Sequence, residues 1–203
     1  MAASKQAEKV GNREKLLVGA MQCLQEKGYA RTTARDLVAA SGANLASIGY
    51  HFGSKEALLN EAVSQSMVLW AKSVEADAFA GEGASAAERL EVALAAMIDR
   101  FGELEPYLVA FVEAFPPAVR SDKLRAAMAA AYEEVRRSGA GAIQRWLALD
   151  GIEISERDAE TLTSLMLAVC DGFLLQWLLD RDRVPSSADL MGALRPVLPA
   201  LAG

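Results

Sequence analysis

Polar side chains suited to holding phosphate lie between residues 33 and 55. Thr33 and Ser54 each precede an apolar segment of helical period, where a hydroxyl caps the free N–H groups of a helix start. Helix starts attract phosphate through those N–H groups and the helix dipole. Lys55 adds a mobile positive charge beside the second start. This chemistry is that of binding a phosphate backbone.

Two short predicted helices carry these groups. A capping box at Thr33-Ala34-Arg35-Asp36 opens a helix that ends at Ser41-Gly42, and Asn44 caps a very short helix from Leu45 to about Tyr50. Two short helices joined by a turn of about four residues with a glycine are typical of a helix-turn-helix. The second helix of such a unit enters the DNA major groove.

The residues from Gly28 to Leu59 show a specific resemblance. They include Thr32-Thr33-Ala34-Arg35-Asp36-Leu37, Ser41-Gly42-Ala43 and Ile48-Gly49-Tyr50-His51-Phe52-Gly53-Ser54-Lys55-Glu56-Ala57-Leu58-Leu59. This pattern resembles the DNA-binding domain of the TetR family of bacterial transcriptional regulators. The resemblance implies DNA contacts for Thr33, Arg35, Asn44, Leu45, Ala46, Ser47, Tyr50, His51, Ser54 and Lys55. Gly49 departs from it, because that position usually carries a side chain that contacts DNA.

The rest of the chain is predicted to be helical. Apolar residues recur at helical spacing over 10–27, 55–78, 86–101, 106–115, 121–148, 156–179 and from 187 to the Pro196–Pro199 region. Pro116-Pro117 is expected to end the segment 106–115. We therefore expect an all-α fold of about nine helices. Its parts are a flexible arm (1–9), a three-helix helix-turn-helix DNA-binding domain (10–59) and a helical ligand-binding and dimerisation domain (60–203).

Composition excludes several classes of protein. The net charge is −6, but residues 1–60 carry +3 and residues 61–203 carry −9, as expected for a phosphate-binding module joined to an acidic sensor. One histidine and two distant cysteines, Cys23 and Cys170, argue against a metal site or a disulfide and for buried thiols. We expect no cofactor and no catalytic site, since no nucleophile–base pair or phosphate loop is present. Residues 1–10 lack a signal-peptide core and no apolar run reaches about 18 residues, so we expect a cytoplasmic protein without a membrane span.

A homodimer interface is predicted on the last two helices. The segment 162–179 is apolar on nearly all sides, which indicates burial on more than one side. It also resembles the dimerisation helix of many TetR-type regulators. The predicted interface residues are Leu162, Met166, Val169, Phe173, Trp177, Leu190, Leu194 and Leu198.

A ligand pocket is predicted among the aromatic residues and methionines of residues 60–203. The candidates are Met97, Phe101, Tyr107, Phe111, Phe115, Met128, Tyr132, Trp146 and Phe173. As a set they suit an adaptable apolar cavity, although each alone also suits plain core. Glu113 either faces this pocket, where its charge needs a partner, or points to solvent.

These features together indicate a DNA-binding repressor. It would bind a palindromic operator in double-stranded DNA as a dimer and be released by an unknown small apolar effector. The alternative is a dimeric ligand-binding or adaptor protein that has lost specific DNA binding, which the bare Gly49 position favours.

Overall fold

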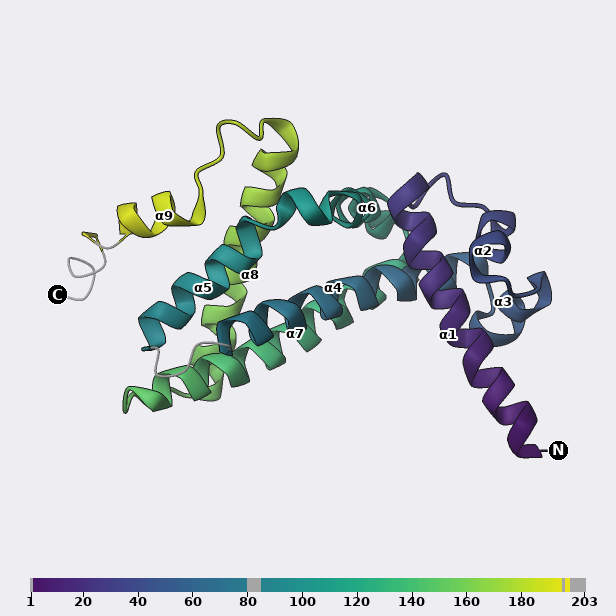
Figure 1. Ribbon diagram of the computed structural model, residues 1–203, viewed down its shortest axis with the longest axis horizontal. Coiled ribbons are helices and arrows are strands. Elements are labelled where there is room, and N and C mark those ends of the chain that lie inside the picture. Colours follow the sequence, from purple (N-terminus) through teal and green to yellow (C-terminus); the bar gives the residue numbers. More distant parts are fainter. Residues whose placement is uncertain (1, 80–84, 195, 198–203) are drawn as a thin grey trace. The chain divides into compact units, whose positions relative to one another are not determined.

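The computed structural model describes residues 2–79, 85–194 and 196–197. These residues form nine α-helices and no strand, which confirms the all-α prediction. The helices are α1 (Ala2–Lys27), α2 (Ala34–Ser41), α3 (Leu45–Phe52), α4 (Lys55–Phe79), α5 (Ala86–Ile98), α6 (Phe101–Arg120), α7 (Asp122–Leu149), α8 (Glu156–Leu179) and α9 (Ser187–Leu194) (Figure 1).

Several helix bounds differ from the prediction. Helix α5 ends at Ile98 and helix α6 begins at Phe101, whereas the break was expected between residues 101 and 106. Helix α1 begins at Ala2 instead of Val10, because residues 2–9 are rich in strong helix formers such as Ala, Lys, Gln and Glu. Helix α6 does not end at Pro116-Pro117 but continues to Arg120. Each proline removes one backbone hydrogen bond, yet its fixed φ lies within the helical range.

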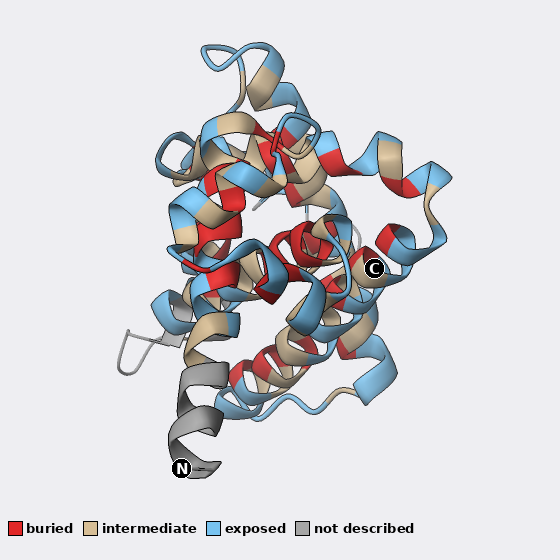
Figure 2. Ribbon diagram, turned by 90° about the vertical axis from the view of Figure 1, so that its right-hand side faces the viewer, coloured by how far each residue is buried: buried red, intermediate tan, exposed pale blue. Residues whose placement is uncertain are grey.

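The helices divide into two compact units. The first comprises residues 1–69 and 105–133, and the second comprises residues 70–104 and 134–203. Along the helices, buried positions fall mostly on one side and exposed positions on the other (Figure 2). The first unit therefore joins the helix-turn-helix to the parts of α6 and α7 that share its apolar core.

The core of the first unit is built mainly from leucines and alanines. Its buried members are Leu16, Leu17, Ala20, Cys23, Leu24, Leu37, Ala43, Ile48, Leu58, Leu59, Ala62, Val63, Ala110, Ala114, Ala118, Leu124 and Met128. Helices α1 to α4 contribute most of them. Helices α2 and α3 therefore pack on α1 and α4 through this core.

Close helix packing organises the second unit. A Cβ placed on Gly139 of α7 would lie 2.5 Å from Cγ2 of Thr163, so only glycine lets α7 approach α8 this closely. Phe101 is 1% exposed and its ring meets that of Trp177 edge to face, 5.8 Å away. The hydroxyl of Ser187 at the start of α9 donates to Asp99 over 2.7 Å.

Helix α4 passes through both units and is bonded to α7 in each. In the first unit, Ser64 Oγ donates to the carbonyl of Ala127 over 3.1 Å. In the second, Ser138 Oγ donates to Glu75 over 2.8 Å. Since α4 starts directly after the helix-turn-helix, it is the covalent link from that motif to the second unit.

Both cysteines are buried and free, as predicted. Burial raises the pKa of the Cys23 thiol, with smaller contributions from nearby carboxylates, and burial likewise raises that of Cys170. Both thiols are therefore neutral packing groups.

Candidate DNA-binding site and ligand cleft

The turn between α2 and α3 has the geometry of a helix-turn-helix. Gly42 ends α2 with a φ of 65°, in the left-handed region that glycine favours, and its N–H donates to the carbonyl of Val38 over 3.0 Å. Asn44 then caps α3, because its side-chain oxygen accepts from the N–H of Ser47 over 2.9 Å. The turn is thus closed by hydrogen bonds at both ends.

A capping box defines the start of α2. Thr33 Oγ1 accepts from the N–H of Asp36, while the Thr33 N–H donates to the Asp36 carboxylate over 2.8 Å. Lys27 forms an ion pair with the other Asp36 oxygen over 2.5 Å. The Lys27 ammonium, followed by the Thr33 donors, holds the pKa of the Asp36 carboxyl well below its usual range. Thr33 is exposed, at the place where a phosphate contact is predicted.

The start of α4 lies close to the start of α2. Ser54 Oγ accepts from the N–H of Ala57 over 3.0 Å and so caps α4. Lys55 donates to the carbonyl of Thr32 over 3.1 Å. Thr32, which the sequence analysis passed over, is 1% exposed, and its hydroxyl donates to the carbonyl of Gly28 over 2.7 Å. Because Lys55 is bonded to Thr32, its ammonium group lies close to Thr33, the next residue in the chain.

The outer face of α3 is mainly apolar. Leu45 is 60% exposed and Tyr50 is 67% exposed, and Ala46 is exposed between them. Ser47 is only 8% exposed, and its hydroxyl donates to Asn44 over 3.0 Å. The structure thus places Ser47 within the motif, so the exposed groups of α3 are Leu45, Ala46 and Tyr50.

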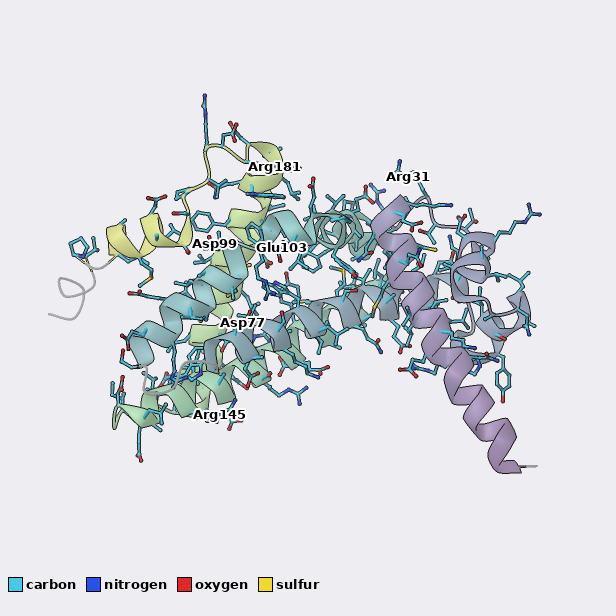
Figure 3. All side chains as sticks on the ribbon, in the orientation of Figure 1. Arg31, Asp77, Asp99, Glu103, Arg145 and Arg181 are labelled. Carbon is cyan, nitrogen blue, oxygen red and sulfur yellow. The ribbon has the colours of Figure 1, made fainter. Side chains whose placement is uncertain are left out.

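Three other polar residues lie on α3, on α2 and just before α2. His51 is half-buried in the last turn of α3, with its ring 5.0 Å from that of Tyr50 in an edge-to-face contact. Arg35 is exposed on α2. Arg31 donates to the carbonyl of Lys27 over 2.7 Å and projects beside the end of α1 (Figure 3).

Gly49 lies on the same helix without any packing reason for glycine. A Cβ at this position meets no other atom within 4 Å, and its φ lies outside the positive region. Larger side chains would fit there, so the lack of one is a property of the binding surface and not of the fold.

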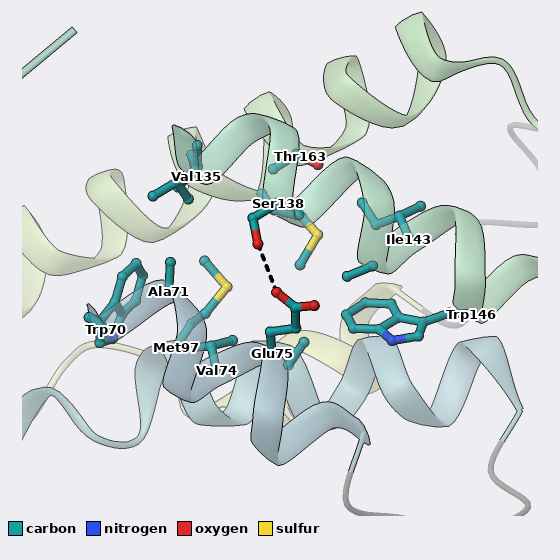
Figure 4. Close-up of a pocket in the computed structure, with 15 residues that line it drawn as sticks. Trp70, Ala71, Val74, Glu75, Met97, Val135, Ser138, Ile143, Trp146 and Thr163 are labelled. Atoms are coloured by element: carbon teal, nitrogen blue, oxygen red, sulfur yellow. Dashed lines mark hydrogen bonds between the residues drawn. The ribbon is translucent and has the colours of Figure 1, made fainter. Parts of the chain in front are cut away.

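The second unit contains a mostly apolar cleft. The volume not filled by atoms is about 520 Å³, and this figure includes the open solvent at the mouth of the cleft. The cleft is lined by Trp70, Ala71, Val74, Glu75, Ala93, Met97, Val135, Ser138, Gly139, Ala142, Ile143, Trp146, Thr163, Met166 and Leu167 (Figure 4). Four helices that are far apart in sequence, α4, α5, α7 and α8, contribute these residues.

The predicted pocket residues are divided between several places. Met97 and Trp146 line the cleft. Phe111, Phe115 and Tyr132 form an aromatic group in the first unit, where the first two rings are 5.1 Å apart. The remaining four lie elsewhere: Met128 is in the core of the first unit, Phe101 packs on Trp177, Tyr107 is exposed and Phe173 is half-buried.

Besides Ser138 of α7 and Thr163 of α8, the polar lining residues that the sequence analysis missed are Trp70 and Glu75. Both lie on α4, whose apolar and polar residues alternate without one clear face. No periodicity along α4 singles out either residue, so the sequence carried no signal for them.

Glu113 does not line this cleft. It is exposed, and its carboxylate lies against Gly28, since a Cβ at Gly28 would come within 2.2 Å of Glu113 Oε2. The solvent-facing alternative for Glu113 is therefore the one that the structure supports.

Comparison with known proteins accounts for both parts of the chain. Residues 16–62 match the family model of bacterial regulatory proteins, tetR family. Residues 86–193 match the model of the C-terminal region of BetI-type transcriptional repressors. This chain belongs to the TetR family. It is thus a transcriptional regulator with a helix-turn-helix DNA-binding domain.

Solved structures share the TetR fold over nearly the full chain. A TetR-family transcriptional regulator from Rhodococcus sp. is 22% identical, with a TM-score of 0.72 and coverage of 94% of this chain and 98% of that one. A regulator from Saccharomonospora viridis in complex with choline is 23% identical, with a TM-score of 0.65 and coverage of 92% and 95%. A fatty acid degradation regulator from Bacillus halodurans is 16% identical, with a TM-score of 0.63 and coverage of 95% of both chains. No curated protein sequence matches the chain.

Helix α8 of this TetR-family protein presents an apolar outer face. We define this α8 outer face as Leu162, Leu165, Leu175 and Leu179, which are 42%, 61%, 51% and 89% exposed. By length and composition, α8 is the one helix in the described part of the chain that could cross a membrane. A helix buried on one side by its own subunit and on the other by a partner has the same composition.

The predicted interface residues lie partly on this face. Leu162 belongs to it, and Leu194 on α9 is 43% exposed. Val169, Phe173 and Leu190 are half-buried, Met166 lines the cleft, and Trp177 packs on Phe101 and under Arg181. Leu198 lies outside the described residues.

Proposed function

We propose that this regulator is a repressor that binds a palindromic operator as a homodimer and is released by a small, mostly apolar effector. The observation that carries the proposal is the course of α4. The helix begins at Lys55, at the end of the helix-turn-helix, and its residues 70–75 line the cleft. One helix therefore belongs to both the DNA-binding site and the ligand site.

DNA binding would be centred on residues 10–59. The starts of α2 and α4 would hold phosphates through Thr33, Ser54 and Lys55, with Arg35 and His51 at the margins. Leu45, Ala46 and Tyr50 would face the major groove, where apolar groups contact thymine methyls and the tyrosine hydroxyl donates or accepts. The exposed Asn44 and the buried Ser47 would hold the first turn of α3, since they bond to each other.

Dimerisation would use the α8 outer face together with Leu194 of α9. A C2 pair of such faces would bury five exposed leucines per subunit, four on α8 and one on α9, in a four-helix arrangement of α8 and α9. The two α3 helices of the dimer, which are its recognition helices, would then read half-sites about one helical turn of DNA apart, or a multiple of it.

Release would follow from binding in the cleft. The lining residues are mainly apolar, which suits an apolar effector, and the Saccharomonospora viridis relative holds choline, a small molecule. An effector shifts the DNA-binding equilibrium only if it binds more tightly to the conformation of the dimer that does not bind DNA. In that conformation, the position of α4 would hold the two α3 helices at a distance that does not match the operator. Movement of α4 around the ligand would change the position of the helix-turn-helix that precedes it.

Fluorescence anisotropy with selected operator DNA tests this proposal. The operator would be obtained by selection from random duplexes with the full-length protein. We expect a palindromic consensus, binding by a dimer, and loss of binding on adding lipophilic compounds. Affinity that stays the same across a broad panel of such compounds would contradict effector release.

A dimeric adaptor without specific DNA binding is the second candidate, and Gly49 favours it. The exposed face of α3 lacks a side chain at this position although the fold leaves room for one. Steep salt dependence on one specific sequence would support the repressor, because phosphate contacts release counterions. Binding of equal strength to all duplexes would support the adaptor.

A further inference from the structure

Glu75 is an exception in the cleft. Of the described lining residues it is the only ionisable one, and most of the others are apolar. It lies between Trp70 and Trp146 in the view of Figure 4, with its carboxylate directed toward Ser138. A carboxylate in an apolar wall disfavours an anionic ligand and favours a cation, because charges interact more strongly where water is scarce.

Glu75 has two partners, the hydroxyl of Ser138, which lines the cleft, and the guanidinium of Arg145, which does not. Arg145 of α7 forms an ion pair with Glu75 Oε1 over 2.6 Å, and the exposed fractions of their side chains are 56% and 26% (Figure 3). Such a pair, more than half exposed on the arginine side, contributes little to stability. An entering cation can therefore replace Arg145, which would turn into solvent.

The two indole rings supply a second attraction for a cation. Trp70 and Trp146 both line the cleft, Trp146 being 5% exposed. Indole faces attract ammonium groups more strongly than any other side-chain ring, and the attraction grows as water is removed. An ammonium group bound to Glu75 would thus lie in a cleft that also has indole rings in its lining, with Met97 and Val74 as apolar neighbours for its hydrocarbon part.

We propose that the effector is a cationic amphiphile, with an ammonium group bound to Glu75 in the cleft that Trp70 and Trp146 also line, and an apolar body in the rest of the cleft. This inference rests on the proposed function, because it names the effector class of the same cleft. It also supplies a coupling step. Glu75 ties α4 to α7 through Ser138 and Arg145, so a ligand that takes over this carboxylate loosens the two helices from each other.

Calorimetry with three probes of one chain length tests the charge preference. Octylammonium, 1-octanol and octanoate are titrated separately into the full-length protein without DNA, at about neutral pH. We expect octylammonium to bind at least about tenfold more tightly than octanol, and octanoate to bind most weakly. Equal affinities for the three, tighter binding of octanoate, or no binding of octylammonium would overturn the inference.

Two variants test the residues. Glu75→Gln should reduce octylammonium affinity to that of octanol and leave octanol binding unchanged. Arg145→Gln should increase octylammonium affinity about two- to fivefold, because it removes the competing cation. Asp77→Asn is the matched control, since it removes a carboxylate of α4 that pairs with Arg100 outside the cleft.

The outcomes separate this inference from the proposed function. If Glu75→Gln binds octylammonium as tightly as the wild type does, the inference is wrong, while release by apolar compounds stays measurable by anisotropy. If the protein binds no specific operator, the repressor role is wrong, while the probe titrations, done without DNA, still decide the ligand class.

Discussion

Gly19 of α1 lies in backbone contact with Ser41, the last residue of α2. A Cβ built on Gly19 would be 2.8 Å from the backbone nitrogen of Ser41 and 3.0 Å from its Cα. Because the obstacle is backbone and not a flexible side chain, α1 and α2 could not keep their present distance with any larger residue. This contact therefore sets how closely α1 and α2 pack at this point.

Gly19→Ala should therefore destabilise the protein, although alanine is the better helix former. We expect a loss of about 1–3 kcal/mol in the free energy of unfolding. Gly49→Ala is the matched control, since its Cβ meets nothing within 4 Å, and it should gain up to about 1 kcal/mol. Urea unfolding measures both. Two substitutions with the same sign would contradict the packing argument.

The Asp36 capping box predicts an acid-dependent stability. Lys27 and Thr33 lower the pKa of Asp36 in the folded state, so ionised Asp36 stabilises the fold above the unfolded-state carboxyl pKa of about 3.9. This contribution falls as pH drops toward the lower folded-state pKa. Asp36→Asn should therefore be less stable than wild type at about pH 6, and the difference should shrink below about pH 4.

The control for this prediction is Lys27→Gln, which removes the largest cause of the shift. The wild type and this variant should converge in stability on acidification, as Asp36 becomes protonated in both. Urea unfolding at several pH values between about 3 and 7 is the measurement. A constant difference between Asp36→Asn and wild type over that range would show that the carboxylate has no special role.

The fold was largely predictable because its signals are local. The capping box at Thr33, the helix end at Gly42 and the Asn44 cap of α3 each act within a few residues, and all three occur as expected. The end of α6 was mispredicted because proline tolerance depends on what the helix packs against. A pair of prolines ends a helix only where tertiary contacts do not compensate for the backbone hydrogen bonds that the prolines remove.

The sites were less predictable because they depend on which side of a helix faces inward. On α8, sequence favoured Met166 and Trp177 for the interface, but these pack within the second unit and leave Leu165 and Leu179 outside. An all-round apolar helix carries no pattern to distinguish these faces. Glu75 was missed for a related reason, since nothing local marks a carboxylate that lines a cleft.

Lys55 offers a test of the phosphate contacts. Lys55→Gln should weaken operator binding and reduce the slope of log affinity against log salt by about 0.9 per subunit, because one phosphate contact is lost in each. Lys55→Arg should keep most of the slope. Lys72→Gln, on α4 but paired with Glu134 in the second unit, is the control that should leave the slope unchanged. An unchanged slope in Lys55→Gln would remove this residue from the DNA-binding site.

The α8 outer face should hold the dimer together. Leu165→Glu places a carboxylate in the proposed interface, where an unpaired charge costs several kcal/mol, so we expect monomers at micromolar concentration in sedimentation velocity. Leu149→Glu on α7 is a close match, because Leu165 and Leu149 are 61% and 63% exposed, and this variant should stay dimeric. The monomeric variant should also lose operator affinity more than tenfold, by our estimate of about 1.4 kcal/mol per factor of ten, since a lone recognition helix reads only one half-site. A Leu165→Glu protein that remains dimeric would move the interface away from α8.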